Sequence, residues 1–343
     1  MELYIADPST GSVVEIPHKS FTESEELNAA KTLQVSLDYG IVNGVAARFN
    51  QTAFFMLSAG YREIYVEKNG TRIYSGIINE IGMDRGEGED ISVSLASTGF
   101  FSLLNKRRTA ELVAFSDDDS GDIAWSLINT SQTVDGNADL GITRGVHPTT
   151  VNRDRTFRFA RISDEIIGMS NAKIANGYDF EVDDDKVFNI YYPAKGSQRP
   201  ELVLDIANVK TISMRKPLIL NMTNRITVLG QADDNFVVRE SPDTFREVFG
   251  NLEDVLAKRD VVQQSTLEDY GDKLLNTDQN PQLSFTVSHD DGTPDILNYN
   301  VGDWLPLSFS EAEITSVMYR VIKRTIQHTA GGATKVTLSM RLQ

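Results

Sequence analysis

One pattern occurs twice in the chain, and this repetition restricts the fold more than any other feature of the sequence. Residues 74–95 read YSGIINEIGMDRGEGEDISVSL, and residues 319–340 read YRVIKRTIQHTAGGATKVTLSM. Aligned without a gap, the identical residues are Tyr74 and Tyr319, Ile77 and Ile322, Ile81 and Ile326, Gly86 and Gly331, and Ser94 and Ser339. Each stretch has the pattern of a strand, a glycine-containing turn and a return strand, so the chain is expected to build one supersecondary unit twice.

The first hundred residues show the alternation that a half-buried antiparallel sheet requires. Apolar side chains alternate with polar ones at Leu33, Val35 and Leu37, at Ile64 and Val66, and at Ile91, Val93 and Leu95. The dipeptide Asn69-Gly70 tolerates the positive φ angles of a tight turn, which predicts that residues 62–66 pair with residues 73–77. Gly76 lies in the second of these strands, where we expect a bend or a bulge.

Helical spacing appears after Lys106. The acidic run Ser116–Asp119 precedes an apolar stripe at residues 123–128, which predicts a helix with acidic residues at its N-terminal end. A second helix is expected from residue 163 to a stop at Asn176-Gly177. Residues 180–192, FEVDDDKVFNIYY, then predict a strand, an acidic turn and a second strand.

The remaining third of the chain combines both kinds of pattern. Strands are expected at Leu202–Leu204 and Ile226–Leu229, and again at residues 283–287. Between them, a polar segment carries apolar residues at helical spacing and ends at Asn280-Pro281; these residues are Leu252, Val255, Leu256, Val262 and Leu274.

The predicted fold class is mixed and mainly β (α+β). We expect two related antiparallel β-barrel domains, an α+β domain between them, and a helical insertion in the second barrel. The expected boundaries are 1–105 for the first barrel, 106–200 for the α+β domain, 201–230 with 282–343 for the second barrel, and 231–281 for the insertion.

Composition excludes several classes of function. The chain has no cysteine, which excludes disulfides and thiolate metal sites. Its net charge of −16 disfavours nucleic-acid binding, because phosphate contacts usually need clustered Lys and Arg. The apolar run Ala53–Leu57 is too short to cross a bilayer and residues 1–4 do not resemble a secretory signal, so we expect neither a membrane anchor nor export by that route.

Acidic clusters and histidines are the candidates for chemistry. The clusters Asp117–Asp119, Asp183–Asp185, Asp233-Asp234 and Asp290-Asp291 could supply carboxylates for glycoside hydrolysis or ligands for calcium. We interpret them as helix caps and turns, because their spacing matches no calcium-binding loop. The four histidines, at positions 18, 147, 289 and 328, do not have metal-ligand spacing. The sequence therefore predicts no catalytic, cofactor-binding or metal-binding residues, no cofactor, and no enzyme activity.

The basic residues and the tryptophans are also expected to have structural roles. Basic residues gather at Lys106–Arg108 and in the set Arg153, Arg155, Arg158 and Arg161. The second set could bind a phosphate or a carboxylate surface, but we expect it to form salt bridges with the protein's own acids or with a partner subunit. Trp125 and Trp304 are expected to be buried anchors. Tyr178, Tyr191 and Tyr192 are the candidate platform of an alternative function, a cell-surface adhesin that binds saccharide. A glycan-cleaving enzyme that uses two of the aspartate clusters is a further alternative.

Six stretches of the sequence resemble one protein family. They are residues 63–81 (EIYVEKNGTRIYSGIINEI), 122–133 (DIAWSLINTSQT), 136–143 (GNADLGIT), 177–193 (GYDFEVDDDKVFNIYYP), 300–307 (NVGDWLPL) and 319–328 (YRVIKRTIQH). With the order of the domains, they resemble the central hub proteins of bacteriophage tail tips and baseplates, a family shared in outline with contractile injection systems.

This resemblance implies a homotrimer whose six barrels form a quasi-sixfold ring that joins a sixfold tail tube to a threefold tip. It implies distal tail or tail-tube proteins above the ring, and a tip, fibre or plug protein below it. DNA would pass through the channel without specific binding, and we expect an acidic lumen. The protein would be made in the host cytoplasm and belong to the virion tail. Because the sequence ends at Gln343, directly after the last predicted strand, we expect no fused lysis domain.

Overall fold

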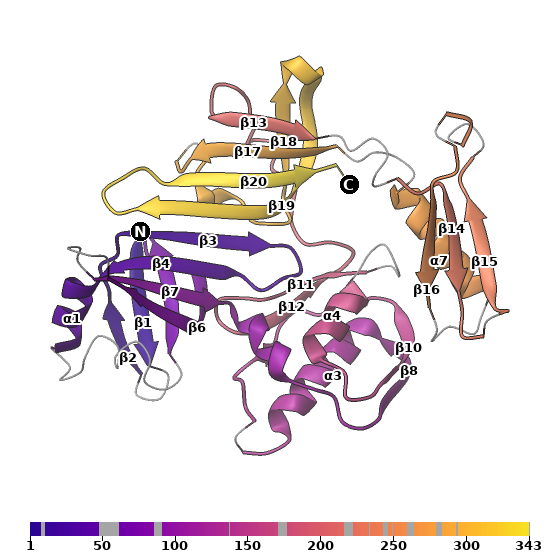
Figure 1. Ribbon diagram of the computed structural model, residues 1–343, viewed down its shortest axis with the longest axis horizontal. Coiled ribbons are helices and arrows are strands. Elements are labelled where there is room, and N and C mark those ends of the chain that lie inside the picture. Colours follow the sequence, from indigo (N-terminus) through magenta and orange to yellow (C-terminus); the bar gives the residue numbers. More distant parts are fainter. Residues whose placement is uncertain are drawn as a thin grey trace.

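The computed structural model describes most of the chain (Figure 1). The described residues are 1–7, 11–47, 62–85, 91–136, 138–170, 177–215, 222–232, 234–242, 246–248, 250–258, 264–278, 283–292 and 294–342. Within these ranges, no helix combines the length and the apolar character needed to cross a membrane. Several positions discussed above lie outside them, namely residues 53–57, Gly86, Asn176, Asp233, Val262 and Asn280-Pro281.

One antiparallel sheet of twelve strands contains both ends of the sequence (Figure 1). Its N-terminal strands are β1 (Glu2–Asp7), β2 (Ser12–Glu15), β3 (Ser20–Glu26), β4 (Thr32–Asp38), β5 (Glu63–Lys68), β6 (Thr71–Asp84) and β7 (Ser92–Thr98), with helix α1 (Tyr39–Ala47) after β4. Its C-terminal strands are β13 (Thr211–Arg215), β17 (Ser284–Asp290), β18 (Trp304–Phe309), β19 (Ile314–Thr329) and β20 (Lys335–Arg341), with short 3-10 turns η2 (Ile296–Asn298) and η3 (Ser310–Ala312). The order is β13-β17-β20-β19-β3-β4-β7-β6-β5-β1-β2, and β18 pairs with β19 beside this path.

The turn predicted at Asn69-Gly70 joins β5 to β6. Both residues have positive φ, 53° and 74°, as this kind of two-residue turn requires. Gly76 is needed where β6 passes the neighbouring strand, because a Cβ atom there would lie 2.4 Å from the carbonyl oxygen of Thr98. The hairpin predicted from the sequence is therefore confirmed, and its glycine allows a close approach of two backbones.

The repeat in the sequence corresponds to a duplicated five-stranded unit. The order β3-β4-β7-β6-β5, which we call the first unit, recurs as β13-β17-β20-β19-β18, the second unit. Three of the five equivalent pairs have equal lengths: β4 and β17 have seven residues each, β7 and β20 have seven, and β5 and β18 have six. The long strands β6 and β19 each contain a bulge opposite their return strands.

These bulges give the register of the duplication. The bulge lies between Ile78 and Glu80 in β6, and between Val321 and Lys323 in β19. Glu80 therefore corresponds to Lys323, and the first residues of β7 and β20, Ser92 and Lys335, correspond to each other as well.

The ungapped match of the two sequences is wrong by two residues. In the structure, the counterpart of Ile326 is Met83, whereas the sequence match paired Ile326 with Ile81. The expected superpositions of Tyr74 on Tyr319 and of Ile77 on Ile322 are wrong as well, because the same shift of two residues applies to them. A slip of two residues leaves every side chain on its own face of the sheet, so apolar alternation alone cannot distinguish the two registers.

Pairing of β19 with β3 joins the two units into one sheet. The expected mainly β, α+β fold class is confirmed. The expected closure into two barrels is not seen among the described strands, because their pairing runs from β13 to β2 without returning to its start. One hydrophobic core extends through both units and includes Leu33 and Val66 of the first and Val287 and Leu338 of the second. The halves of the sheet therefore fold around shared apolar contacts.

The α+β unit packs beneath the sheet in Figure 1. Its elements are η1 (Phe100–Lys106), β8 (Val113–Asp119), α3 (Ser120–Thr133), β9 (Thr143–Arg144), β10 (Asn152–Phe157), α4 (Ile162–Ser170), β11 (Asp179–Val182) and β12 (Val187–Tyr191). As expected, Asp119 caps α3: its carboxylate accepts hydrogen bonds from the backbone amides of Gly121 at 2.8 Å and Asp122 at 3.3 Å. Both predicted helices and the predicted hairpin are present.

The insertion differs from its prediction. Strands β14 (Arg225–Leu229), β15 (Phe236–Glu240) and β16 (Glu253–Ala257) form a separate three-stranded sheet, against which α7 (Gln264–Asp278) packs. The strand expected at Ile226–Leu229 therefore belongs to the insertion rather than to the second barrel. Residues 253–257, expected to be helical, form a strand because they pair in parallel with β14.

The insertion leaves and rejoins the large sheet at neighbouring positions. Arg215, the last residue of β13, pairs directly with Ser284, the first residue of β17. The insertion also has its own apolar core, centred on Ile226, Val228 and Leu267. It is therefore an excursion whose two ends meet, and loop closure tolerates a change in its length at modest entropic cost.

We expect the large sheet to fold without the insertion. Replacement of residues 217–282 by a short Gly/Ser linker should give a soluble protein with less helix and a cooperative thermal transition, measured by circular dichroism. A chain that lacks cooperative unfolding after this replacement would show that the insertion contributes to the main core.

Candidate functional site

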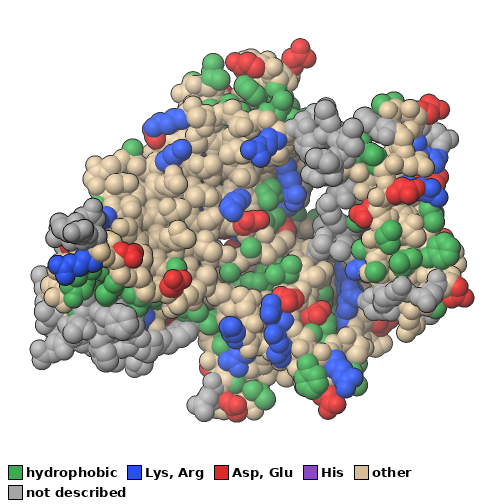
Figure 2. Space-filling view, in the orientation of Figure 1, with side chains coloured by type: hydrophobic (Ala, Val, Ile, Leu, Met, Phe, Trp, Pro, Cys, Tyr) green, Lys and Arg blue, Asp and Glu red, His purple; other side chains and the backbone are tan. Residues whose placement is uncertain are grey.

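The face of the large sheet that points away from the core carries mainly serine and threonine. One row of directly paired residues crosses seven strands, from β7 through β4, β3, β19, β20 and β17 to β13. Its members, in order, are Thr98, Thr32, Ser24, Thr325, Thr337, Ser288 and Thr211. Two neighbouring pairs of hydroxyls lie within hydrogen-bond distance, Ser24 and Thr325 at 3.4 Å and Thr211 and Ser288 at 2.6 Å. Figure 2 shows this hydroxyl face as a continuous tan area over the sheet.

The hydroxyl face is nearly neutral although the chain has a net charge of −16. Two opposite charges on adjacent strands, Lys323 and Glu26, lie 3.2 Å apart. The other charged residues of this face lie toward its margins, with Glu80 and Asp84 at the end of β6 that extends beyond its pairing with β5, and Arg215 on the edge strand β13. The face therefore offers hydrogen-bonding groups but little net charge.

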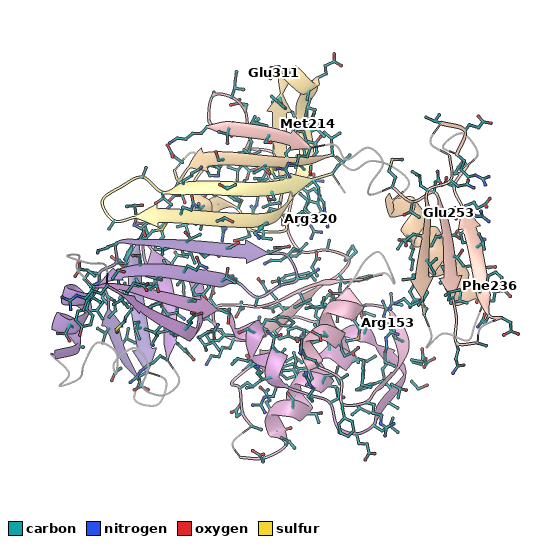
Figure 3. All side chains as sticks on the ribbon, in the orientation of Figure 1. Arg153, Met214, Phe236, Glu253, Glu311 and Arg320 are labelled. Carbon is teal, nitrogen blue, oxygen red and sulfur yellow. The ribbon has the colours of Figure 1, made fainter. Side chains whose placement is uncertain are left out.

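A buried ionic network lies where the two units meet the α+β unit, and its Arg324–Glu25 pair is on the core face of the sheet. Arg324 of β19 and Glu25 of β3 are both buried, and their side chains lie 2.9 Å apart. Arg320, labelled in Figure 3, pairs with Asp179 of β11, so a second arginine of β19 contacts the α+β unit. These ion pairs join three parts of the molecule that are distant in the sequence.

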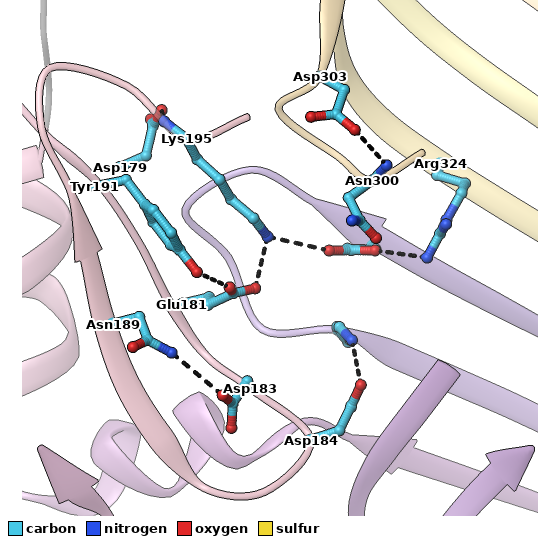
Figure 4. Close-up of polar contacts among 12 residues, drawn as sticks. Asp179, Glu181, Asp183, Asp184, Asn189, Tyr191, Lys195, Asn300, Asp303 and Arg324 are labelled. Carbon is cyan, nitrogen blue, oxygen red and sulfur yellow. Dashed lines mark hydrogen bonds and ion pairs between the residues drawn. The ribbon is translucent and has the colours of Figure 1, made fainter. Parts of the chain in front are cut away.

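Lys195 extends this network, as Figure 4 shows. Its ammonium lies 2.6 Å from Glu181 of β11 and 3.6 Å from Glu25. Nearby, Asp184 binds the ammonium of Lys31 at 2.8 Å and accepts a hydrogen bond from the backbone amide of Ser75 at 2.7 Å. Through Asp184, the acidic turn between β11 and β12 therefore binds the α+β unit to the first unit.

The pKa values of two glutamates of β3 are shifted in opposite directions. Burial alone would raise the pKa of Glu25, but the charges of Lys31, Arg324 and Lys195 lower it to about 2. Burial raises the pKa of Glu23 to about 8, against the attraction of Arg324. Glu23 is 0% exposed, and among the described residues neither of its carboxylate oxygens has a hydrogen-bond partner. We infer that Glu23 is protonated at neutral pH and Glu25 is ionised.

Members of three of the four aspartate clusters make structural contacts, and Asp233 of the fourth lies outside the described residues. Asp119 caps a helix, and Asp183 accepts hydrogen bonds from the backbone amides of Asp185 and Val187 in the turn before β12. Asp290 and Asp291 pair with Lys210 and Lys68, each at 2.7 Å. The part of the chain that the structure describes contains no group of three or more acidic or histidine side chains that could hold a metal ion.

The histidines and arginines are likewise in protein contacts. His289 lies 2.9 Å from the hydroxyl of Tyr299, and His147 lies 2.9 Å from the carbonyl of Phe188. The ring centroids of His18 and His328 lie 5.4 Å apart with the rings tilted by 50°, and burial lowers the pKa of all four histidines. Of the basic set, Arg158 pairs with Glu111 at 3.8 Å, Arg161 pairs with Asp164 at 3.4 Å, and Arg107 donates to the carbonyls of Ser131 and Ala138.

The aromatic candidates do not form a common exposed platform. Tyr178 is buried, Tyr191 is partly buried and hydrogen-bonded to Glu181, and Tyr192 is exposed. Trp125 and Trp304, which were expected to be buried anchors, are both only partly buried.

The buried network was not predicted from the sequence. Its signal lies in β3, where Phe21, Glu23 and Glu25 occupy every second position and point into the core. Glutamates at core positions of a strand are rare unless they are paired, and this pattern indicates partners elsewhere in the chain.

Comparison with known proteins gives matches in structure alone: no family profile and no curated protein matches the sequence. The 43 kDa tail protein of prophage MuSo2 from Shewanella oneidensis has a TM-score of 0.70 and 11% identity, over 99% of this chain and 97% of that one. A tail protein from Neisseria meningitidis MC58 has a TM-score of 0.68 and 11% identity, over 100% and 96%. Prophage tail protein gp18 from Listeria monocytogenes EGD-e has a TM-score of 0.61 and 10% identity, over 100% and 95%. The chain therefore has the fold of phage tail proteins, which confirms the resemblance at the level of the fold.

The titration of Glu23 predicts a stability that depends on pH. Its ordinary pKa is 4.5 and its folded pKa is about 8, so between these values the folded protein retains a proton that the unfolded chain has released. Stability should therefore fall as the pH rises through this window. Glu23→Gln should remove this part of the decline and raise the melting temperature at pH 9, by about 2–4 °C for each kcal/mol regained.

Glu25→Gln is the matched control, measured by thermal unfolding between pH 5 and 9. It removes an ionised partner of buried Arg324, so it should destabilise the protein at neutral pH by on the order of 3 kcal/mol. Equal effects of the two substitutions, or an unchanged pH profile for Glu23→Gln, would contradict the assignment of the two protonation states.

Proposed function

We propose that this chain is a structural component of a phage tail tip or baseplate, and that three copies form a hub ring with quasi-sixfold symmetry. The observation that carries the proposal is the duplicated unit. Each chain contains two equivalent units joined edge to edge, so three chains supply six similar units around one axis. A ring of this kind presents approximate sixfold symmetry to a tail tube and exact threefold symmetry to a tip.

The hydroxyl face is the proposed wall of the channel. It is the face of the joined units that lies opposite their shared core, and its Ser and Thr side chains extend across seven strands. DNA binds proteins mainly through Lys and Arg contacts to phosphate, and these are scarce on this face. The expectation of an acidic lumen is replaced by that of a nearly neutral one, on which DNA passes without a strong attraction or repulsion.

The proposed surroundings follow from this position. Distal tail or tail-tube proteins would bind one side of the ring, and a tip, fibre or plug protein would bind the other, within the virion tail. We propose no enzymatic activity, because the acidic clusters described above act as caps, turns and ion-pair partners. The adhesin alternative loses support because Tyr178 of its candidate platform is buried.

The mass of the purified protein in solution tests the proposed ring. Light scattering after size-exclusion chromatography should give three times the chain mass of 38.1 kDa. A stable dimer, or a chain that remains monomeric at the highest soluble concentration, would contradict the hub ring.

DNA binding tests the proposed wall. The triple substitution Thr22→Lys, Gln34→Lys and Thr325→Lys places three cations on the hydroxyl face and should create salt-sensitive binding of duplex DNA, measured by fluorescence anisotropy. The matched control places three lysines on the insertion, at Phe236, Val238 and Val255, and should bind less tightly because these positions lie outside the channel. The unsubstituted protein should not bind at physiological salt. Equal affinity of the two triple variants would argue against a channel lined by the hydroxyl face.

A further inference from the structure

Two strand edges in the described chain lack the neighbour that their counterparts have. In the second unit, residues 323–327 of β19 pair with β20 on one side and with β3 on the other. The corresponding end of β6, residues 80–84, pairs on one side with β7 and, among the described residues, with no strand on the other. β13 similarly pairs with β17 alone within the described sheet. Such edges readily accept a further strand.

The two edges belong to β6 and β13, and their counterparts in the duplication, β19 and β3, pair with each other inside the chain. β6 is the counterpart of β19, and Met83 is the counterpart of Ile326. β13 is the counterpart of β3, because each is the outer neighbour of equivalent strands, β17 and β4. Glu23 lies opposite Leu33 of β4, and Met214 lies opposite Phe285 of β17 at the equivalent position, so Met214 is the counterpart of Glu23.

We propose that β6 of one copy pairs antiparallel with β13 of a second copy, with Met83 directly opposite Met214. Inside the chain, the equivalent residues Ile326 and Glu23 are direct partners in the β19–β3 ladder. Transferring that register to the free edges places Asp84 opposite Ser213 and Gly82 opposite Arg215. The proposal rests on the proposed ring and names the contact that joins its subunits.

The exposure of the two methionines supports this register. Met83 is 38% exposed and Met214 is 42% exposed, whereas Ile326 and Glu23, at the equivalent positions of the internal junction, are both 0% exposed. Met83 and Met214 both point to the core side of the sheet, as Ile81 and Ile212 do two residues away. Pairing of the edges would therefore bury two large apolar side chains against each other.

The charged side chains on the hydroxyl face of the two edges are also consistent with this register. Arg215 would lie opposite Gly82 and diagonally next to Glu80 and Asp84, the acidic side chains that flank Gly82 on the same face of β6. All three charged side chains are exposed in the single chain. The edge of β6 is thus acidic where the edge of β13 is basic, which favours contact between different edges over contact between two copies of the same edge.

The contact is head to tail, because it joins two different edges of each copy. Such contacts repeat from copy to copy and form a closed ring when the rotation closes. In the assembled ring, junctions between chains would alternate with the β19–β3 junction inside each chain, and every junction would use the same ladder register.

Disulfide trapping tests the register, and the natural chain has no cysteine to interfere. The double variant Met83→Cys with Met214→Cys, oxidised as the full chain, should give cross-linked multimers on a non-reducing gel, because directly opposite residues of an antiparallel pair lie within disulfide range. Met83→Cys with Ile212→Cys is the control: Ile212 is on the same face of β13 but two residues out of register, and it should give little cross-linking. Mixing the two single-cysteine variants should give covalent dimers alone.

Mass measured on the reduced samples separates this proposal from the proposed ring. A trimer in which the 83/214 pair does not cross-link, or in which both pairs cross-link equally, overturns the edge pairing and leaves the ring standing. A protein that is not trimeric and does not cross-link overturns both.

As a second readout, Arg215→Glu should weaken the trimer by placing three acidic groups together, and Glu80→Arg with Asp84→Arg should restore it in that background. Loss of the trimer without restoration would contradict the predicted charge contact.

Discussion

The pairing of β19 with β3 is the contact on which the rest of the structure depends. It brings together segments about three hundred residues apart, and it converts two five-stranded units into one sheet with one core. Because the strands pair in a fixed register, the pairing also aligns the serine and threonine side chains of both units into continuous rows on one face. The neutral outer face and the buried ionic inner face are therefore two consequences of a single ladder.

The buried ionic network determines how the other parts are held. Taking charges out of water is costly, so a buried ion pair adds little net stability, whereas removal of one partner is strongly destabilising. Here Arg320 and Arg324 of β19 bind Asp179 and Glu25, so one strand fixes both the first unit and the α+β unit. Protonated Glu23 lies in the same network without a hydrogen-bond partner among the described residues, which makes this junction sensitive to pH.

Local patterns in the sequence predicted local structure well. The hairpin turn at Asn69-Gly70, the cap at Asp119 and the duplicated strand pattern all depend on residues close together in the chain, and all are present. Features that depend on distant partners were not predictable in this way. The period of two in a strand cannot fix the register of the repeat, and the short run Glu253–Ala257 became a strand because β14 lies beside it. The ion-pair partners of Glu25, Lys195 and Arg324, come from two distant parts of the chain, so no local pattern reveals them.

The proposed ring places equivalent sheet units, two from each chain, around a channel with their hydroxyl faces toward the axis. Electron cryomicroscopy of the purified assembly can show this arrangement. We expect a closed threefold particle with six similar sheet units, continuous strand pairing around the ring, and the Thr98-to-Thr211 row facing the central opening. A particle of twofold symmetry, or a ring in which this row faces outward, would contradict it.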